Sequence, residues 1–250
     1  MPHRFGRGRT LLAAFGTVIL ALAAAAASPA QAAGGYPSHS GGYDISWPQC
    51  GGPYPGLQSY DFGIVGINAG RPMTTNPCFA SELQWAEQNA PFAGIYMNVA
   101  FGLSFAGPQL CDARDEPCQA YNYGWLSGQY DYVTALTDSG GASEEVASWW
   151  LDVETENDWT NQPALNAAVI QGLLDYLQQA QGITAGVYSV SFMWREIAGS
   201  YAPAGVPNWV AGGNDLNDFA TCGRPIWPGG QPVLFQSLTA DGMFDVDRGC

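Results

Sequence analysis

The sequence predicts one compact α/β domain, a (β/α)8-type (TIM-like) barrel that is irregular or has fewer than eight helices. Strand-like and helix-like segments alternate along the chain, as in parallel βα units. The 209 residues from Gly42 to Cys250 are enough for one domain with a substantial core. No glycine-rich loop follows the first strand-like segment, which disfavours the alternative, an open doubly wound sheet with a phosphate-binding turn.

Seven short apolar segments rich in Val, Ile, Trp and Tyr are expected to be strands. They are residues 43–47, 62–68, 94–100, 148–154, 185–190 and 208–211, with a weaker one at 233–237. The clearest helix is 163–181, where apolar residues recur at i, i+3 and i+4 between Pro163 and Gly182. Residues 79–89 and 192–199 are also expected to be helical. A helix over 120–136 is interrupted by Gly124 and Gly128.

Residues 1–32 have the organisation of a signal peptide. Three arginines precede an apolar run over 11–27, and an A-x-A cleavage signal ends at Ala32. The alternative, an uncleaved membrane anchor, is disfavoured because the run is shorter than the ~20 residues that a spanning helix needs. We therefore expect a secreted protein, extracellular or associated with the cell wall, with no stable membrane insertion. Residues 33–42, rich in Gly and Ser, are expected to be a flexible linker before a domain over 43–250.

Six cysteines follow the predicted signal peptide, and an even number in an exported protein indicates disulfides. Six cysteines allow 15 pairings. We expect neighbours in sequence to pair, as Cys50–Cys78, Cys111–Cys118 and Cys222–Cys250. A metal site is the alternative, but the chain has no paired C-x-x-C motif and no histidine near one.

The charge balance excludes several classes of function. The chain has no lysine, and after signal cleavage five arginines stand against 22 acidic residues, a formal net charge of −17. Phosphate binding needs a basic surface, so nucleic acid is not an expected partner. A neutral or cationic partner such as a polysaccharide is compatible, although the acidity can also serve only to keep a secreted protein soluble.

The expected domain contains neither histidine nor lysine, because His39 lies in the expected linker. This excludes Ser-His-Asp and Cys-His catalysis, Schiff-base chemistry and His-ligated zinc. An enzyme of this composition must use carboxyl groups as general acid and general base, and tyrosine is the less favoured alternative. No cofactor and no metal are expected, although calcium bound near Glu156 and Asp158 is an alternative use of the acidic loop there.

Asp152 and Glu154 are two acids within the apolar run that starts at Trp149. Side chains alternate along a strand, so both acids are expected on one face. Bringing like charges together near a buried surface is costly and is usually tolerated at a site of chemistry. A pair of carboxyl groups is also what glycoside hydrolysis requires. A polar surface strand is the alternative.

Further acids and amides fall where a barrel would gather them, at the carboxyl ends of its strands. Asp44 lies in the first expected strand, and Asn68 and Asn98 end the second and third. Asp245 and Asp247 lie near the end of the chain. An exposed strand end for Asp44, and an exposed tail for the last two, are the alternatives.

Aromatic residues are abundant, with nine tryptophans. The faces of sugar rings stack on aromatic side chains, so a glycan-binding groove would use some of them, although most are expected in the core. The best groove candidates lie at the ends of expected strands. They are Trp47, Tyr96, Tyr188 and Trp209.

An ordered set of motifs resembles glycoside hydrolase family 25, the lysozyme-type N-acetylmuramidases. The motifs are D-I-S-W at 44–47, L-D-V-E at 151–154, G-V-Y-S at 186–189 followed by Trp194, W-V-A at 209–211, F-Q-S at 235–237 and V-D at 246–247. They resemble, in the same order, the family's D-V-S, D-x-E, G-x-Y-T/S, W-x-A, W-Q-Y and V-D. The D-I-S-W-P-Q-C opening is most similar to the secreted bacterial branch of family-25-like domains.

The resemblance implies a barrel that cleaves the β-1,4 bond between muramic acid and glucosamine units of peptidoglycan. It implies Glu154 as general acid and Asp152 as the group that stabilises the charged sugar or orients its N-acetyl group. Asp44 and Asp247 would complete the acidic floor. The residues expected to contact substrate are Trp47, Asn68, Tyr96, Asn98, Tyr188, Trp209, Gln236 and Asp245.

Two departures from the family pattern leave alternatives open. The second expected strand lacks the K-x-x-E motif, and the third lacks the histidine of Y-H-F. These are groove positions. The sequence therefore predicts a secreted, monomeric glycoside hydrolase of peptidoglycan, with two alternatives. One is a non-catalytic glycan-binding barrel of the cell envelope, and the other is a glycosidase or transglycosylase acting on another polysaccharide.

Overall fold

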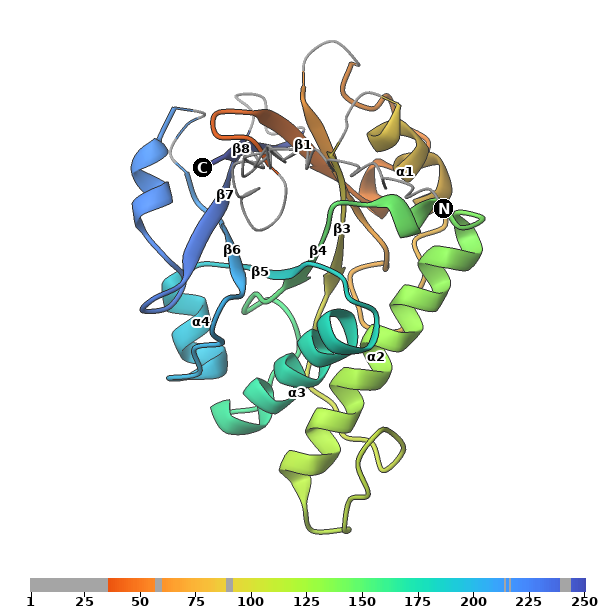
Figure 1. Cartoon of the computed structure of the whole chain (residues 1–250), viewed down its shortest axis with the longest axis vertical. Coiled ribbons are helices and arrows are strands. Elements are labelled where there is room, and N and C mark those ends of the chain that lie inside the picture. Colours follow the sequence, from red (N-terminus) through yellow and green to blue (C-terminus); the bar gives the residue numbers. More distant parts are fainter. Residues whose placement is uncertain (1–35, 57–59, 89–91, 214, 216, 239–243) are drawn as a thin grey trace, which may run out of the picture. The chain divides into compact units, whose positions relative to one another are not determined.

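In the part of the chain that the structure describes, eight strands close into a barrel in the order β1 to β8, with four α-helices outside it (Figure 1). The computed structural model describes residues 36–56, 60–88, 92–213, 215, 217–238 and 244–250. The expected signal peptide, 1–32, and residues 33–35 of the expected linker lie outside the described residues. The closed barrel with fewer than eight helices confirms the predicted fold class.

The strands are short and the helices unequal in length. The strands are β1 Gly41–Ile45, β2 Phe62–Gly66, β3 Phe92–Asn98, β4 Ser148–Asp152, β5 Ala185–Ser189, β6 Pro207–Val210, β7 Gln231–Leu238 and β8 Asp245–Gly249. The helices are α1 Phe79–Glu87, α2 Glu116–Asp138, α3 Pro163–Asp175 and α4 Ser191–Ala198. A π-helical turn, Tyr176–Ala180, continues α3, and 3-10 turns lie at Trp47–Gln49, Ala142–Glu145 and Phe219–Gly223.

All seven expected strands are present, and β8 was not predicted as a strand. β1 to β7 run parallel to one another, whereas β8 is antiparallel to both β7 and β1. The sequence of β8 alternates Asp245, Val246, Asp247 and Arg248 without an apolar run, so its composition gave no strand signal. Because β8 closes the barrel, its two acids belong to a strand and not to an exposed tail.

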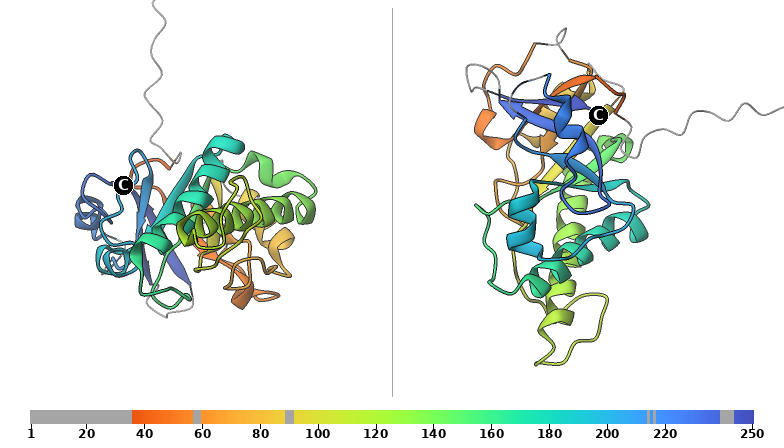
Figure 2. Two further views of the ribbon diagram at one scale, coloured as in Figure 1. Left: turned by 90° about the horizontal axis from the view of Figure 1, so that it is seen from below. Right: turned by 90° about the vertical axis from the view of Figure 1, so that its left-hand side faces the viewer.

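Helix α2 is longer than predicted and continues through Gly124 and Gly128, the two glycines expected to interrupt it. A Cβ atom at Gly124 would lie 2.0 Å from the carbonyl oxygen of Val169 on α3, and one at Gly172 would lie 2.1 Å from that of Tyr121 on α2. The two helices therefore touch backbone to backbone where they cross (Figure 2). Close packing, not helix termination, explains these glycines.

The core has two layers, separated by the strands. Outward-facing residues such as Trp149 and Leu151 of β4 pack against the helices. Inward-facing residues fill the barrel, where Trp150 and Trp209 lie in edge-to-face contact with ring centroids 5.8 Å apart. The alternation predicted for β4 is thus observed, and it directs Asp152 into the barrel.

Tyr36 occupies the barrel at the amino ends of the strands. Its hydroxyl group bonds to Ser148 Oγ at 2.9 Å, and its ring meets Phe62 edge-on with centroids 4.6 Å apart. Its side chain is 3% exposed. The expectation of a flexible linker up to residue 42 was therefore wrong for 36–42, because one aromatic side chain fills the open barrel end and Gly41 and Gly42 already belong to β1. The Gly- and Ser-rich composition concealed this.

The three expected disulfides are confirmed: Cys50–Cys78, Cys111–Cys118 and Cys222–Cys250. The last joins the 3-10 turn before β7 to the residue that follows β8. Within the described part of the chain, no helix has the length and apolar character needed to cross a membrane.

Candidate active site

A cavity of about 290 Å³ lies at the carboxyl ends of the parallel strands. Its lining comes from seven of the strands and from Glu154 just after β4, and all eight lining residues were candidates from the sequence. They are Asp44, Tyr96, Asp152, Glu154, Tyr188, Trp209, Gln236 and Asp245. None of them is basic, and four are acids.

The first pair of acids, Asp152 and Glu154, lies at the end of β4. Asp152 is the last residue of the strand and Glu154 follows it. The backbone N–H of Val153 still bonds to the carbonyl oxygen of Tyr188 at 3.0 Å, so the extended pairing with β5 continues one residue further. Asp152 and Glu154 therefore line the same cavity, as the i, i+2 spacing predicted.

The carboxyl groups of Asp152 and Glu154 are neighbours, and each shifts the pKa of the other. Asn98 Nδ2 donates to Asp152 Oδ2, whereas Asp152 Oδ1 is buried and has no hydrogen-bond partner among the described residues. Two adjacent carboxyl groups resist ionising together. The pair therefore holds a proton to a higher pH than two separate carboxyl groups would.

Burial is the largest cause of the pKa shift in both acids. Burial, followed by the charge of Glu154, raises the pKa of Asp152 well above its usual value. Burial and the charge of Glu156 also raise the pKa of Glu154, but its hydrogen bond with Asp152 lowers it. The pKa is thus raised for both acids, and burial acts more strongly on the deeper Asp152.

Asp44 lies directly opposite Asp245 in the β1–β8 register. Burial, and next the charge of Asp245, raise the pKa of Asp44 to about 7. Gln236 Nε2 donates to Asp44 Oδ2 at 2.9 Å, which favours the charged form and opposes these effects. The second acid site is therefore near its titration midpoint at neutral pH.

Asp247 lies behind this wall and does not line the cavity. It is fully buried and accepts a hydrogen bond from Trp209 Nε1 at 2.8 Å. Burial raises its pKa well above the usual range, and the charge of Asp44 adds to this. Asp44 and Asp247 thus form a second pair of interacting carboxyl groups, one layer deeper than the first.

Aromatic residues make the remaining walls. Tyr188 and Trp209 meet edge-on with ring centroids 4.6 Å apart, and the Tyr188 hydroxyl donates to Gln236 Oε1 at 2.6 Å. Burial raises the pKa of Tyr96 and Tyr188 well above 10.0. Both tyrosines therefore remain neutral and can donate hydrogen bonds.

Three other expected substrate contacts lie outside the cavity lining. Trp47 belongs to the 3-10 turn after β1 and is 47% exposed. Asn68 is buried behind the strands. Asn98 reaches the site through its hydrogen bond to Asp152.

Asp131 is a buried acid that sequence reasoning missed. It lies on α2, is 1% exposed, and accepts a hydrogen bond from Asn68 Nδ2 at 3.2 Å. Burial raises its pKa to about 8. A single aspartate on a helix is usually a solvated residue, so the sequence carried no signal for it.

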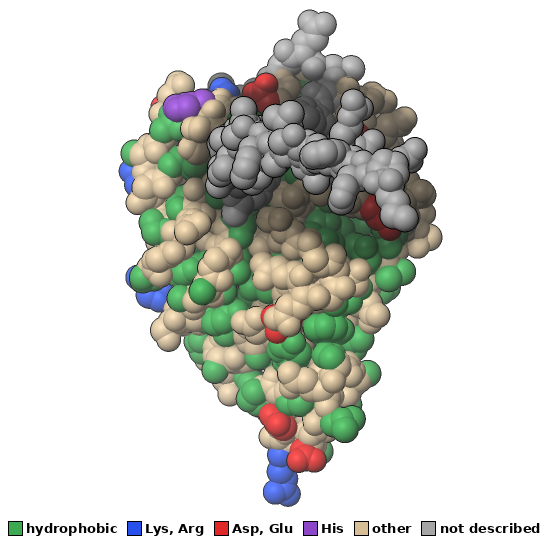
Figure 3. Space-filling view, viewed as in Figure 1, with side chains coloured by type: hydrophobic (Ala, Val, Ile, Leu, Met, Phe, Trp, Pro, Cys, Tyr) green, Lys and Arg blue, Asp and Glu red, His purple; other side chains and the backbone are tan. Residues whose placement is uncertain are grey.

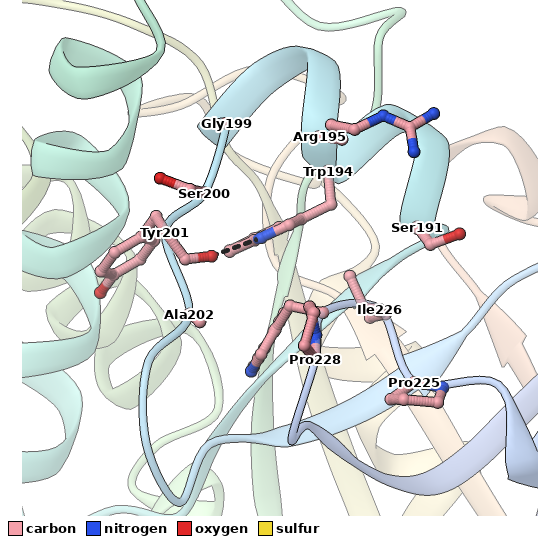
Figure 4. A pocket seen from close by; sticks show the side chains of 11 residues that line it. Ser191, Trp194, Arg195, Gly199, Ser200, Tyr201, Ala202, Pro225, Ile226 and Pro228 are labelled. Atoms are coloured by element: carbon pink, nitrogen blue, oxygen red, sulfur yellow. Dashed lines mark hydrogen bonds between the residues drawn. The ribbon is translucent and has the colours of Figure 1, made fainter.

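A larger cavity lies elsewhere, between α4 and the segment before β7 (Figure 4). It measures about 720 Å³, and its lining includes Trp194, Arg195, Tyr201 and Trp227 but no carboxyl group. Trp194 Nε1 donates to the Tyr201 carbonyl oxygen at 2.8 Å, so this N–H group already has a partner within the protein. This cavity therefore offers no carboxyl group for acid–base chemistry.

No group of three or more His, Cys, Asp and Glu residues suited to a metal ion occurs among the described residues. Arginine side chains are few and separate on the face shown in Figure 3. The arrangement can donate and accept protons through carboxyl groups, and it can hold a neutral polar ligand.

A family model described as "Lysozyme-like protein 1" matches residues 125–214. No curated protein matches the chain in sequence. Among solved structures, the chain is similar to a muramidase from Acremonium alcalophilum, with a TM-score of 0.55, 17% identity, and coverage of 84% of this chain and 93% of that one. It is also similar to a family GH25 lysozyme from Aspergillus fumigatus, with a TM-score of 0.51 and 15% identity. That match covers 85% of this chain and 94% of the lysozyme.

The autolysin LytC from Streptococcus pneumoniae, in complex with a synthetic peptidoglycan ligand, gives a TM-score of 0.52 at 15% identity, with 83% of this chain covering 46% of LytC. The chain likewise covers 66% of the CTP1L endolysin, at a TM-score of 0.53. At these identities the likeness shows a common fold.

Proposed function

We propose that this chain, which has the barrel fold of the family-25 lysozymes and matches a lysozyme-like family model, is a glycoside hydrolase that cleaves β-1,4 bonds of bacterial peptidoglycan. The observation that carries the proposal is the pair of neighbouring carboxyl groups, Asp152 and Glu154, on the wall of a cavity without basic residues. Glycoside hydrolysis needs a carboxylic acid that protonates the leaving oxygen and a carboxylate that stabilises or traps the charged sugar.

Glu154 is the proposed general acid. It is the less buried member of the pair and lines the cavity, where a leaving oxygen can reach it. A sugar in the cavity displaces water from Glu154 and raises its pKa further, because desolvation disfavours its charged form. The proton held by the pair then moves from Asp152 to Glu154, and from there to the glycosidic oxygen as its bond to the sugar carbon breaks.

Asp152 becomes ionised when its proton moves to Glu154. Its carboxylate, buried beside the cavity, can then stabilise the positive charge that develops on the sugar ring. The Asn98 amide already donates to one of its oxygens, which favours the charged form. The two acids thus exchange roles between the resting and the reacting state.

Asp44, Asp247 and Asp245 are proposed as the acidic floor. Since Asp44 has a pKa of about 7, this floor becomes more negative as the pH rises through neutrality. A more negative floor favours a cationic transition state, but it also holds protons on the Asp152–Glu154 pair. Tyr96, Tyr188, Trp209 and Gln236 are proposed substrate contacts, and Trp47 is a proposed outer contact because of its exposure.

The site of action is proposed to be outside the cell, at or near the cell wall, with the protein acting as a monomer. The support is the signal-like sequence of residues 1–32, the three disulfides and the peptidoglycan-bound LytC structure among those with this fold. A polysaccharide partner also agrees with the strongly negative net charge.

The test is to incubate the mature protein with purified peptidoglycan, reduce the products with borohydride and identify the reduced sugar by mass spectrometry. Cleavage as a muramidase predicts new ends that carry reduced muramic acid. New ends that carry reduced glucosamine would mean a different bond specificity. Binding to peptidoglycan without any new reducing end would replace the proposal with a glycan-binding barrel, the reading favoured by the missing K-x-x-E and histidine in β2 and β3.

A further inference from the structure

Four polar groups form a continuous hydrogen-bonded line from helix α2 to the carboxyl pair. Asp131 on α2 accepts from Asn68, which follows β2, at 3.2 Å. Asn68 is bonded to the backbone of Asn98 at the end of β3. The side chain of Asn98 then donates to Asp152. The line passes from the helix layer, through the barrel wall, to the inside of the barrel.

Asn68 holds Asn98 by two bonds. Its Nδ2 donates to the Asn98 carbonyl oxygen at 3.2 Å, and its Oδ1 accepts from the Asn98 backbone N–H at 3.1 Å. The β2 strand ends at Gly66. Beyond it, the side-chain amide of Asn68 makes the two hydrogen bonds to the β3 backbone that a further strand residue would make. Since the amide has two donors, Asn68 Nδ2 can also reach Asp131.

The outer half of the line is fully buried. Asn68 and Asp131 are both 1% exposed, and burying two polar side chains is costly unless each finds a partner. Neither serves as a helix cap. Both are connected to Asn98 at the end of β3. The only described side-chain hydrogen bond of Asn98 goes to Asp152.

We propose that Asn98 is a positioning residue for the Asp152–Glu154 pair, and that Asn68, anchored by Asp131, holds Asn98 in place. By donating to Asp152 Oδ2, Asn98 fixes the orientation of this carboxyl group, whose Oδ1 is buried and has no described hydrogen-bond partner. It also stabilises the ionised form that Asp152 must adopt during the reaction. This inference rests on the proposed function for its kinetic consequence but not for its electrostatic one.

Several other groups interact electrostatically with the Asp152 carboxyl group. They are Asp44 from β1, Tyr96 from β3, Glu154 and Glu156 after β4, and Tyr188 from β5. All are acids or neutral hydroxyls, and none of them is a cation. The Asn98 amide is therefore a donor that no neighbouring positive charge duplicates.

The test is Asn98→Leu, which keeps the branched shape and the number of side-chain heavy atoms and removes the amide. Loss of a hydrogen bond to a charged group is expected to raise the titration midpoint of the pair by about one pH unit and to lower kcat about ten- to hundredfold, with KM within about twofold. Carboxyl 13C NMR measures the midpoint without substrate. Asn98→Ser, which is smaller and polar, should shift the midpoint in the same direction and serves if the leucine variant does not fold.

The matched control is Asn122→Leu. Asn122 is a fully buried asparagine on α2 that bonds to the backbone of Gln109, away from the cavity. It should lose stability without moving the midpoint of the pair.

An unchanged midpoint in folded Asn98→Leu and Asn98→Ser overturns the inference, whether or not the protein is active. A shifted midpoint in a protein that never cleaves peptidoglycan supports the positioning role and rejects the proposed function. Equal shifts in the Asn98 variants and in Asn122→Leu would also overturn it, because they would reflect general loosening.

Discussion

Replacing Asp131 with asparagine is expected to remove a large part of the pH dependence of folding stability. Burial raises the pKa of this carboxyl from 3.8 to about 8, so the folded chain holds the proton more tightly than the unfolded chain. The stability linked to Asp131 is therefore complete below about pH 4 and is lost as the pH rises toward 8. Asparagine is neutral at every pH and keeps an oxygen to accept from Asn68.

The size of the effect follows from the buried position. Asp131 is 1% exposed, so solvent screens little of the penalty. One proton corresponds to about 1.4 kcal/mol per pH unit, which gives a difference of about 4 kcal/mol between the variant and the wild type over three pH units. Asp131→Asn should match the wild type near pH 4 and exceed it increasingly up to pH 7.5.

Urea unfolding at pH 4.5, 6 and 7.5, with disulfides intact, measures the free energies by linear extrapolation. Asp138→Asn is the matched control, since Asp138 is an exposed residue on the same helix. The free energy of unfolding of this variant should change with pH in the same way as that of the wild type. If the difference between Asp131→Asn and the wild type is constant across these pH values, the reasoning about the buried carboxyl is refuted.

Three further substitutions test the fold around the site. Tyr36→Ala should lower the free energy of unfolding by about 3–5 kcal/mol, because the amino end of the barrel loses its aromatic filling; a change below 1 kcal/mol in chemical denaturation would mean that the end is not packed. Gly172→Ala should cost about 1–3 kcal/mol, since its Cβ would lie 2.1 Å from the Tyr121 carbonyl oxygen; equal melting temperatures would contradict the backbone contact of α2 and α3. Removing the Cys222–Cys250 disulfide, which spans 28 residues, should cost about 3–4 kcal/mol by differential calorimetry and loosen β8; wild-type stability would reject that role.

The strands that the sequence predicted are those with a continuous apolar run, because both faces of a parallel barrel strand are covered. β8 escaped prediction because its inner face carries Asp245 and Asp247 in place of apolar residues. The two acids are unusual for a strand interior, and the sequence singled them out as acids that a barrel would gather without indicating the strand that carries them. Local composition cannot reveal that a charged strand closes a barrel.

The candidate site was largely predictable, because its residues lie at strand ends and the barrel brings those ends together. The roles of Asn68 and Asn98 were not. Their spacing placed them at the right edge, but only the three-dimensional structure reveals that Asn68 turns to the backbone and that Asp131 comes from a helix to meet it. Contacts between distant segments leave no local pattern in a single sequence.

The central claim is that Glu154 passes the proton held by the carboxyl pair to a glycosidic oxygen. It is tested most directly by the rate of release of reducing ends from peptidoglycan by the wild type, Glu154→Gln and the exposed control Glu144→Gln. Loss of a general acid predicts that Glu154→Gln is slower by about a hundred- to ten-thousandfold, while Glu144→Gln keeps the wild-type rate. Cleavage by folded Glu154→Gln at a rate within threefold of the wild type would contradict the account.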